Sequence, residues 1–389
     1  MAGTPNRMAT LVAALATVGV CDVAFGLTLQ LQPLILDKAG LSAFTIGTIA
    51  AAGPLGILLG GPFLPRLIAR FGLKTMALVA LADIAVCLAG MAVLPPLYYW
   101  YVLRFFLGLG SSSLFTIGEV WMLSLATEST RGRIMGIYTS MLSVTFAIGP
   151  FILPFTGIDG LLPWAIGIAF VLAALIPLAA VKPMETGEHE KAGHFFAVAR
   201  RAPLLFMAFG ACTLFDAVII AFFTIFATRH GISLPVASTI LGTGILSGVT
   251  MFYAIGLWAD RWSKNGVIII CAVVTISAAV MLPSAISTIF IWPLLMALMT
   301  CAFGVYVVAL AAIGDTFDGP DVVAASAAVG AMWGFGGLLG PTLAGRAIDT
   351  FGINAFPFVL ASFYAMLLLA MLLNGGRIVV PRKKQDKTQ

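Results

Sequence analysis

Long apolar stretches follow one another along almost the whole chain, and each is long enough to cross a lipid bilayer. A hydrocarbon core about 30 Å thick needs about 20 apolar residues in a helix, and stretches of that length leave no room for a soluble domain between them. Hydrophobic residues make up 61% of the 389 residues and charged residues only 10%, unlike soluble domains. We therefore predict an integral membrane protein. Its spans should be helices, because a bilayer offers no water to an open sheet edge.

Charged clusters and Pro/Gly clusters divide the chain into twelve candidate spans. They are predicted at 8–36, 43–65, 75–95, 97–125, 134–158, 161–181, 203–229, 233–259, 267–283, 287–314, 322–348 and 352–374. The first begins at Met8 and lacks a small-residue cleavage site, so we expect a retained span and no signal peptide. The five cysteines lie in apolar stretches without close pairs, which predicts packing residues and neither a disulfide framework nor a zinc site. The predicted fold class is all-α integral membrane, with 12 transmembrane helices.

Most of the 21 lysine and arginine residues fall in alternate loops. Because cytoplasmic loops retain positive charge, this pattern predicts a multi-pass protein with both termini in the cytoplasm. The segments predicted to be cytoplasmic hold Arg7, Arg66, Arg70, Lys74, Arg131, Arg133, Lys182, Lys191, Arg200, Arg201, Arg261, Lys264 and the basic residues from Arg377 onward. The net charge of +5 then reflects topology and anionic lipid headgroups, and no nucleic acid is needed to explain it.

The longest polar interval, "KPMETGEHEKAGHFFAVARR" at 182–201, falls near the midpoint of the chain. It predicts a cytoplasmic linker between an N-terminal six-helix bundle at 1–181 and a C-terminal six-helix bundle at 202–389, which ends in a basic cytoplasmic tail. Its His189, Glu190 and His194 partly match a zinc-peptidase helix. The two histidines are five residues apart where one helix face needs four, so we interpret the segment as a solvated linker and predict no metal site.

An internal repeat relates the two halves. A shift of 191 positions brings "LDKAGLS" at 36–42 onto "ATRHGIS" at 227–233, and it overlays Gly149-Pro150 on Gly340-Pro341. Two halves in the same orientation, joined by a cytoplasmic linker, are typical of parallel repeats in secondary transporters. Substrate is then expected near the midplane, between the halves.

Several motifs resemble those of one transporter family. "GLWADRWSK" at 256–264 is similar to the cytoplasmic loop motif of the major facilitator superfamily, and "PRLIARFGLK" at 65–74 is similar to a degraded copy with Pro65 and Ala69 in place of Gly and Asp. "RFFLGLG" at 104–110 resembles the span 4 motif of its proton-driven antiporters. "GEVWMLSLATESTRGRIMGIY" at 118–138 resembles the YcaD-like bacterial permeases. The resemblance implies two six-helix bundles related by a pseudo-two-fold axis, in a bacterial inner membrane.

Charged side chains inside spans are costly in a bilayer, so they mark candidate functional positions. Asp22 lies near mid-depth in the first span, about 21 Å from its inner end, and shares a polar face with Gln30. Arg104 enters the fourth span about 10 Å deep from the outside, and the resemblance implies that it pairs with Asp22. The predicted substrate- and proton-binding set is Asp22, Gln30, Arg104, Ser112, Asp216 and Thr224. The alternative is a static network that only orients helices.

Glu119 lies 15 residues after Arg104 on the same predicted helix, about 22 Å away, so the two charges must have different roles. By family analogy Glu119 is near the Arg70 loop, and we predict that it belongs to an ionic latch that closes the inner side. A plain helix-end charge is the alternative. The predicted gating set is Arg70, Gly72, Glu119, Arg131, Arg133, Asp260 and Arg261, whereas Asp83 is assigned to packing or pairing.

These features predict a secondary active transporter that exports a small organic or amphipathic solute by proton-coupled alternating access. Burial favours a protonated Asp22 or Asp216 and a nearby Arg104 favours the ionised form, so proton affinity can change as the site hydrates. Two alternatives stay open: a uniporter or importer of an organic anion held by Arg104, and a non-transporting protein of this fold, such as a lipid flippase, sensor or assembly factor. No catalytic constellation has a recognisable spacing, so we predict neither an enzyme nor a cofactor. The expected partners are a small-molecule substrate, protons and membrane lipids, with the protein as a monomer.

Overall fold

The computed structural model describes residues 7–125, 131–181, 200–317, 320–376 and 378, and every long regular element in them is an α-helix. The helices are α1 (Arg7–Lys38), α2 (Ala43–Gly60), α3 (Leu64–Phe71), α4 (Leu73–Val93), α5 (Tyr98–Leu125), α6 (Arg131–Thr156), α7 (Leu162–Ala173), α8 (Leu175–Ala180), α10 (Pro203–Arg229), α11 (Leu234–Arg261), α12 (Lys264–Ala285), α13 (Ile291–Thr316), α14 (Pro320–Phe351) and α15 (Ala355–Leu373). Ten described segments are long and apolar enough to cross a membrane, or eleven with the bent α11. The 32-residue α14 packs beside α2 and α10. The predicted all-α membrane fold is confirmed.

Helix boundaries repeat with the period found in the sequence. α2 begins at Ala43 and α11 at Leu234, 191 residues apart. The starts of α4 and α12 and the ends of α1 and α10 have the same offset. The two halves are therefore built from the same helices in the same order, as the pseudo-two-fold arrangement requires.

The turns before α2 and α11 show how the sequence produces this repeat. Gly40 has a φ of 75° and Gly231 a φ of 84°, in the left-handed region that side chains avoid. Ser42 and Ser233 follow in extended conformation as the N-cap residues of the next helices. Ser is favoured there because its side chain can accept from a first-turn N–H, as Ser42 does from the backbone N–H of Thr45.

The second span is shorter than its predicted range of 43–65. α2 ends at Gly60, and the chain turns through Gly61 and Pro62 before α3 begins. Glycine weakens a helix, and proline cannot donate the helical hydrogen bond, so this sequence interrupts the span. In the other half α11 continues past the equivalent point, with a bend of 41° between Val249 and Met251.

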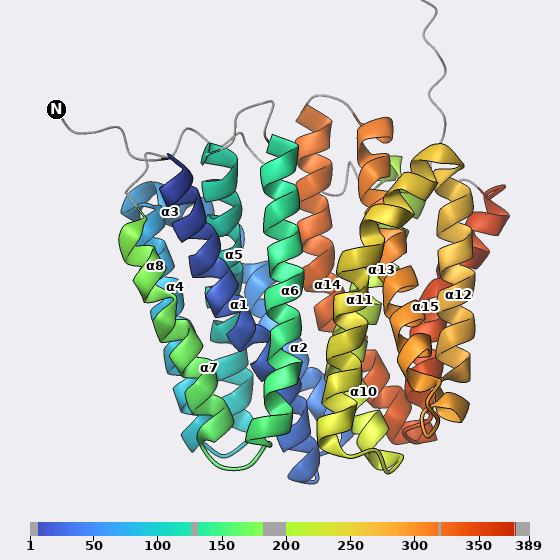
Figure 1. The fold of residues 1–389 in the computed structure, drawn as a ribbon, viewed down its shortest axis with the longest axis horizontal. Coiled ribbons are helices and arrows are strands. Elements are labelled where there is room, and N and C mark those ends of the chain that lie inside the picture. Colours follow the sequence, from blue (N-terminus) through green and yellow to red (C-terminus); the bar gives the residue numbers. More distant parts are fainter. Residues whose placement is uncertain (1–6, 126–130, 182–199, 318–319, 377, 379–389) are drawn as a thin grey trace, which may run out of the picture.

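Figure 1 shows the two halves side by side, with α1 to α8 in blue to green and α10 to α15 in yellow-green to red. The halves meet where α2 packs on α14, α6 on α11 and α1 on α10. A Cβ at Gly47 would lie 2.1 Å from the carbonyl oxygen of Pro341, and one at Gly345 would lie 2.2 Å from that of Ala43. Such close backbone approach is how small residues associate membrane helices. Most of the predicted linker at 182–201 lies outside the described residues, so the domain boundaries stay a prediction.

Candidate functional site

The two ends of the helix bundle carry different chemistry, and we name them by their residues. The Asp37 end contains the turns at 37–42, from α1 to α2, and at 229–233, from α10 to α11. The basic end is opposite and contains α3 and the turn at 261–264, from α11 to α12. The charge pattern of the loops predicts that the basic end is cytoplasmic.

Asp22 lies in the middle of α1, where this helix crosses α6. Gly26 lets the backbones touch, because a Cβ there would lie 1.9 Å from the carbonyl oxygen of Phe146. One residue earlier on α6, the hydroxyl of Thr145 lies 2.7 Å from Oδ2 of Asp22. Asp22 is 3% exposed, and no basic side chain in the described part of the chain forms an ion pair with it. The predicted proton-binding residue is thus a buried carboxyl group beside a neutral hydroxyl.

Thr145 has one hydroxyl hydrogen and two close acceptors. Its Oγ1 lies 2.7 Å from Asp22 and 2.8 Å from the carbonyl oxygen of Met141, one turn earlier on α6. A hydroxyl group donates only one hydrogen. The hydroxyl of Thr145 therefore donates either to Oδ2 of Asp22 or to the carbonyl oxygen of Met141, and the bond to Asp22 favours the carboxylate. Sequence analysis missed Thr145, because threonine inside a span is common and its neighbour on α1 is 123 residues away.

The equivalent crossing in the other half has no acid. The 191-residue shift places Thr213 on Asp22 and Gly336 on Thr145. Here α10 and α14 touch directly, since a Cβ at Gly336 would lie 2.3 Å from Oγ1 of Thr213. The acid of this half, Asp216, lies three residues later, is half-buried, and has no hydrogen-bond or ion-pair partner among the described residues. The halves therefore share their architecture and differ in the chemistry at their centres.

The predicted pair between Arg104 and Asp22 does not form in this structure. Arg104 is 5% exposed, and its Nη2 donates to the carbonyl oxygen of Ala50 on α2 at 3.3 Å. It lies about 9 Å from the start of α5 at the Asp37 end, whereas Asp22 lies about 24 Å from that end of α1. At the depth of Arg104, α2 and α5 are in backbone contact, because a Cβ at Gly108 would lie 2.0 Å from the carbonyl oxygen of Gly53. The arginine is thus held between two helices, about 15 Å from the depth of the acid.

Gln30 and Thr224, both assigned to the binding set, meet at the interface between the halves. Nε2 of Gln30 lies 2.5 Å from Oγ1 of Thr224 on α10 and 3.2 Å from Oγ of Ser238 on α11. All three side chains are buried. Because they lie between Asp22 and the Asp37 end, they close that side of the interface in this structure.

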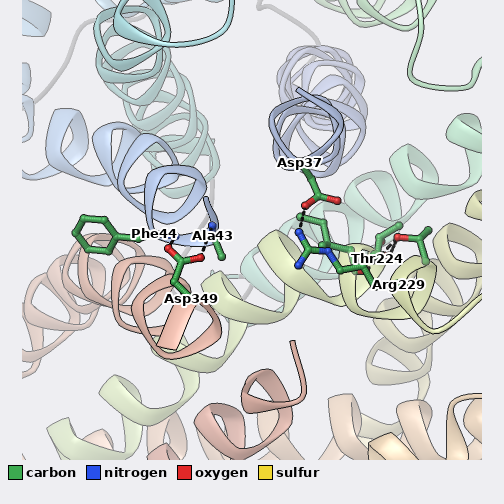
Figure 2. A network of polar contacts seen from close by, with 8 residues as sticks. Asp37, Ala43, Phe44, Thr224, Arg229 and Asp349 are labelled. Atoms are coloured by element: carbon green, nitrogen blue, oxygen red, sulfur yellow. Dashed lines mark hydrogen bonds and ion pairs between the residues drawn. The ribbon is translucent and has the colours of Figure 1, made fainter. Parts of the chain in front are cut away.

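Charged side chains extend this interface to the Asp37 end, as Figure 2 shows. Asp37 at the end of α1 forms an ion pair with Arg229 at the end of α10. Asp349 of α14 accepts from the backbone N–H groups of Ala43, at 2.8 Å, and Phe44, at 2.9 Å. First-turn N–H groups have no acceptor within their own helix and carry the positive end of its dipole, so a carboxylate suits them. One half therefore caps a helix of the other.

Toward the basic end, α5 extends past the end of α2. Gly108 of α5 contacts α2, and Ser112, Phe115 and Glu119 lie further along the same face of α5. Exposure increases along it, from half-buried Ser112, whose hydroxyl bonds to Leu109 of its own helix, to exposed Glu119. Glu119 has no hydrogen-bond or ion-pair partner among the described residues. A free carboxylate therefore lies where α2 no longer covers α5.

An aromatic cluster lies in the other half. Tyr306 of α13 is the repeat equivalent of Phe115. Its ring contacts Trp333 of α14 and Phe209 of α10 edge to face, with centroid distances of 5.7 Å and 5.4 Å. We name Phe209, Tyr306 and Trp333 the aromatic cluster. Residue type alone could not single out these rings among so many aromatic residues in spans.

The other gating candidates lie at the basic end. Arg70 is exposed and stacks on the ring of Phe71, 5.3 Å from its centroid, and Gly72 ends α3 with a φ of 80°. Asp260 and Arg261 are exposed at the end of α11. The side chains of Arg131 and Arg133 lie outside the described residues, so the predicted latch with Glu119 stays a prediction.

Ion pairs at the basic end stay within one half. Lys264 and Asp315, both in the C-terminal half, are 2.5 Å apart, and Arg201, at the end of the linker just before α10, pairs with Asp321 of that half. Lys74 bonds to the carbonyl oxygens of Ala179 and Val181 in its own N-terminal half. None of these described contacts joins the two halves.

Asp83, assigned to packing, lies against α5. A Cβ at Gly110 would be 2.3 Å from Oδ2 of Asp83, so the glycine makes room for the carboxyl group. In the part of the chain that the structure describes, no group of three His, Cys, Asp or Glu side chains could hold a metal ion.

Related sequences and structures agree with this architecture. The profile of the Major Facilitator Superfamily matches residues 13–313. The uncharacterized MFS-type transporter YfkF of Bacillus subtilis (strain 168) is 23% identical over 376 residues, which cover 91% of this chain and 93% of the relative. The uncharacterized MFS-type transporter YcaD of Salmonella typhimurium is 23% identical over 362 residues, covering 90% and 92%. The resemblance to YcaD-like permeases is confirmed at this distance.

Solved structures share the fold at low sequence identity. A variant of the nucleoside transporter NupG superposes with a TM-score of 0.80 at 12% identity, over 94% of this chain and 99% of that one. A bacterial homologue of the human lysosomal transporter Spinster, in an inward-facing and unoccupied conformation, gives a TM-score of 0.71 at 16% identity, over 97% and 95%. With a family profile that spans most of the chain and an all-helical membrane fold to match, the protein belongs to the major facilitator superfamily of secondary transporters.

Proposed function

We propose that the protein exports a small organic or amphipathic solute across a bacterial inner membrane in exchange for protons, and that Asp22 is the proton carrier. The observation that carries this proposal is the burial of Asp22 without a basic partner. An ionised carboxylate without a counter-charge is strongly unfavourable in such a place. A carboxyl group that is neutral when enclosed and ionised when hydrated can take up a proton from one side and release it to the other.

The hydroxyl of Thr145 links the charge of Asp22 to the contact between α1 and α6. It donates to Oδ2 of Asp22 and also lies 2.8 Å from the carbonyl oxygen of Met141. An ionised Asp22 attracts the donor hydrogen more strongly than a protonated one, because a charge-assisted hydrogen bond is stronger. A change of protonation therefore changes the contact between two helices, which is a way to couple protonation to helix movement.

The difference between the two ends supports alternating access. Polar contacts between the halves lie on the Asp37 side of Asp22, whereas the ion pairs described at the basic end lie within a half. With the basic end in the cytoplasm, as the charge pattern predicts, this state is closed to the outside and takes up solute from the cytoplasm. Pro150 in α6 and Pro341 in α14 interrupt two helices of the interface and provide bends about which the halves can rock.

The alternative of an organic-anion carrier has less support. It depends on a free Arg104, yet the guanidinium group is covered by α2 and bonded to Ala50. An anion could reach it only after α2 separates from α5, where Gly53 and Gly108 are in backbone contact.

Flux in proteoliposomes tests the proton role of Asp22. Protein would be reconstituted with an imposed pH gradient, and the uptake of a cation (ethidium), an anion (fluorescein) and a neutral solute (uridine) would be compared. We expect Asp22→Asn to reduce gradient-driven flux to the level of empty liposomes. The matched control is Asp159→Asn, which removes an exposed carboxylate at the Asp37 end, paired only with Lys38. Full gradient-driven flux in Asp22→Asn would refute the proposal.

Infrared spectroscopy tests the protonation state without any solute. The wild-type protein should show a carboxylic acid C=O band from protonated side chains within the spans, and Asp22→Asn should remove the Asp22 component of this band. An unchanged spectrum in the variant would show that Asp22 is ionised in this state.

A further inference from the structure

We propose that Cys271 of α12 and Cys301 of α13 form an oxidation site, at which an organic hydroperoxide converts the two thiols into a disulfide that joins the helices. The sequence predicted the five cysteines as packing residues without close pairs. The structure contains them as free thiols and brings these two together, because α12 and α13 are consecutive helices that pack side by side. This role goes beyond the proposed transport function and does not depend on it.

The first step concerns the position of the two thiols. Sγ of Cys271 lies against α13, where a Cβ at Gly304 would be 3.1 Å from it. Cys301 is one helical turn before Gly304, and residues three apart lie on the same face of a helix. The side chains of Cys271 and Cys301 interact with each other. The two sulfur atoms are therefore neighbours at one helix crossing.

The second step concerns the same crossing in the other half. The 191-residue shift places Cys271 on Ala80 of α4 and Cys301 on Gly110 of α5. A Cβ at Gly110 would lie 3.2 Å from the carbonyl oxygen of Ala80, so α4 and α5 are in contact at this point. The repeat thus independently places positions 271 and 301 opposite each other. The C-terminal half carries a thiol on both helices, whereas alanine and glycine in the N-terminal half carry no reactive group.

The third step concerns access to the pair. Cys301 is partly exposed, whereas the other four cysteines, Cys271 included, are buried. Cys301 lies about 15 Å from the start of α13, well inside the span, where an organic hydroperoxide can partition from the lipid. An accessible thiol beside a second thiol is typical of redox-sensitive pairs, in which the first is oxidised and the second resolves the product. Cys301 is therefore assigned the first role and Cys271 the second.

The reaction has two steps. The sulfur of Cys301 attacks the terminal oxygen of the hydroperoxide, the O–O bond breaks, and the departing alkoxide takes the thiol proton and leaves as an alcohol. Cys301 is then a sulfenic acid. The sulfur of Cys271 attacks the sulfur of this sulfenic acid, the S–O bond breaks, and the departing hydroxide takes the Cys271 proton and leaves as water. One hydroperoxide is reduced to an alcohol, and two thiols are oxidised to a disulfide.

The disulfide changes one half of the protein and not the interface between the halves. Both α12 and α13 belong to the C-terminal half, so the new bond does not oppose rocking. It closes a loop of about 30 residues, and such a link stabilises a fold by restricting the unfolded chain. Oxidation should therefore raise the temperature at which the protein unfolds.

Counting thiols tests the oxidation site. The purified full-length protein in detergent would be treated with cumene hydroperoxide, unfolded and labelled with N-ethylmaleimide, and the labels would be counted by mass spectrometry. Two of the five free thiols should be lost, with the peptides of Cys271 and Cys301 joined, and dithiothreitol should restore both. The pair should react at least about tenfold faster than the three other cysteines, because buried thiols without a reactive neighbour are inert.

Three variants assign the roles of the thiols. Cys301→Ser should form no disulfide. Cys271→Ser keeps the accessible thiol without its partner, so the sulfenic acid at Cys301 should persist and be captured by dimedone. Cys87→Ser is the matched control, because it removes a buried thiol that lies 3.8 Å from Oδ1 of Asp83, and it should form the disulfide as the wild type does.

The proposal is overturned if all five thiols survive the hydroperoxide, if the disulfide joins other cysteines, or if Cys301 is oxidised to a sulfinic or sulfonic acid without joining Cys271. Because the first readout is made on the wild-type protein, a variant that fails to fold does not decide the outcome. The assay uses neither solute nor pH gradient, so failure here leaves the proposed transport function standing.

Discussion

The Asp37 end and the basic end use their charged side chains differently. At the Asp37 end, Asp37 and Asp349 reach from one half to the other, to Arg229 and to the first turn of α2. At the basic end, the described ion pairs, such as Lys264 with Asp315, join helices of the same half. Contacts within a half move with it and do not oppose rocking, whereas contacts between halves must break. In the proposed cycle, the Asp37 end is therefore the end whose described contacts between the halves must break.

The largest effect on the balance between the closed and open states is expected from a substitution where two backbones are in contact at the Asp37 end. A Cβ at Gly47 would lie 2.1 Å from the carbonyl oxygen of Pro341, so Gly47→Val cannot be accommodated with the halves together. Overpacking of about 1–3 kcal/mol shifts the balance between closed and open states about 5- to 150-fold. A cysteine at Ser238, buried in the interface, should then react with an impermeant maleimide from the Asp37 side. The control is Gly210→Ala, because a Cβ at Gly210 meets nothing within 4 Å. Equal labelling of both variants would contradict the idea that contacts between the halves keep the Asp37 end closed.

A smaller effect is expected from the helix cap that crosses the halves. Asp349→Ala removes the acceptor for the backbone N–H groups of Ala43 and Phe44. Loss of an N-cap costs about 1 kcal/mol, so labelling of the cysteine at Ser238 should rise about fivefold. If Asp349→Ala lowered thermal stability without changing the labelling rate, the cap would serve folding alone.

The ion pair between Asp37 and Arg229 should contribute less. Both side chains are partly exposed, and such pairs are worth at most about 1 kcal/mol. Asp37→Asn should therefore raise the labelling rate only about twofold. The swap Asp37→Arg with Arg229→Asp should restore the wild-type rate, and a swap that labels like the single variant would show that the pair does not hold the halves together.

The smallest effect is expected at the basic end. Asp315→Asn breaks a pair with Lys264 that lies within the C-terminal half. Labelling at Ser238 should not change, and thermal unfolding should show a cost of at most about 1 kcal/mol. A labelling change as large as that of Asp37→Asn would remove the distinction between the two ends.

Much of the fold could be predicted because its signals are local. The span predicted at 203–229 coincides with α10, since an apolar run bounded by Pro203 and the "RHG" turn has clear ends. The predicted end of the second span at 65 was wrong, because Gly60, Gly61 and Pro62 end the helix before the apolar run is complete. The site was predicted as a set of candidates with one pair, Asp22 with Arg104, and this pair does not form in the structure. Asp22 was identified by its charge in a span, yet its neighbour is Thr145 and not Arg104.

The sequence by itself determined that the chain lies in a membrane, that its helices repeat after 191 residues, and which ionisable residues lie within them. Each of these can be derived from short stretches of sequence and from the length of helix that crosses a bilayer. Only the tertiary structure decided which of those residues meet. Glycines such as Gly26 and Gly108 set the depth at which distant helices cross, and a side chain can reach only partners at its own depth.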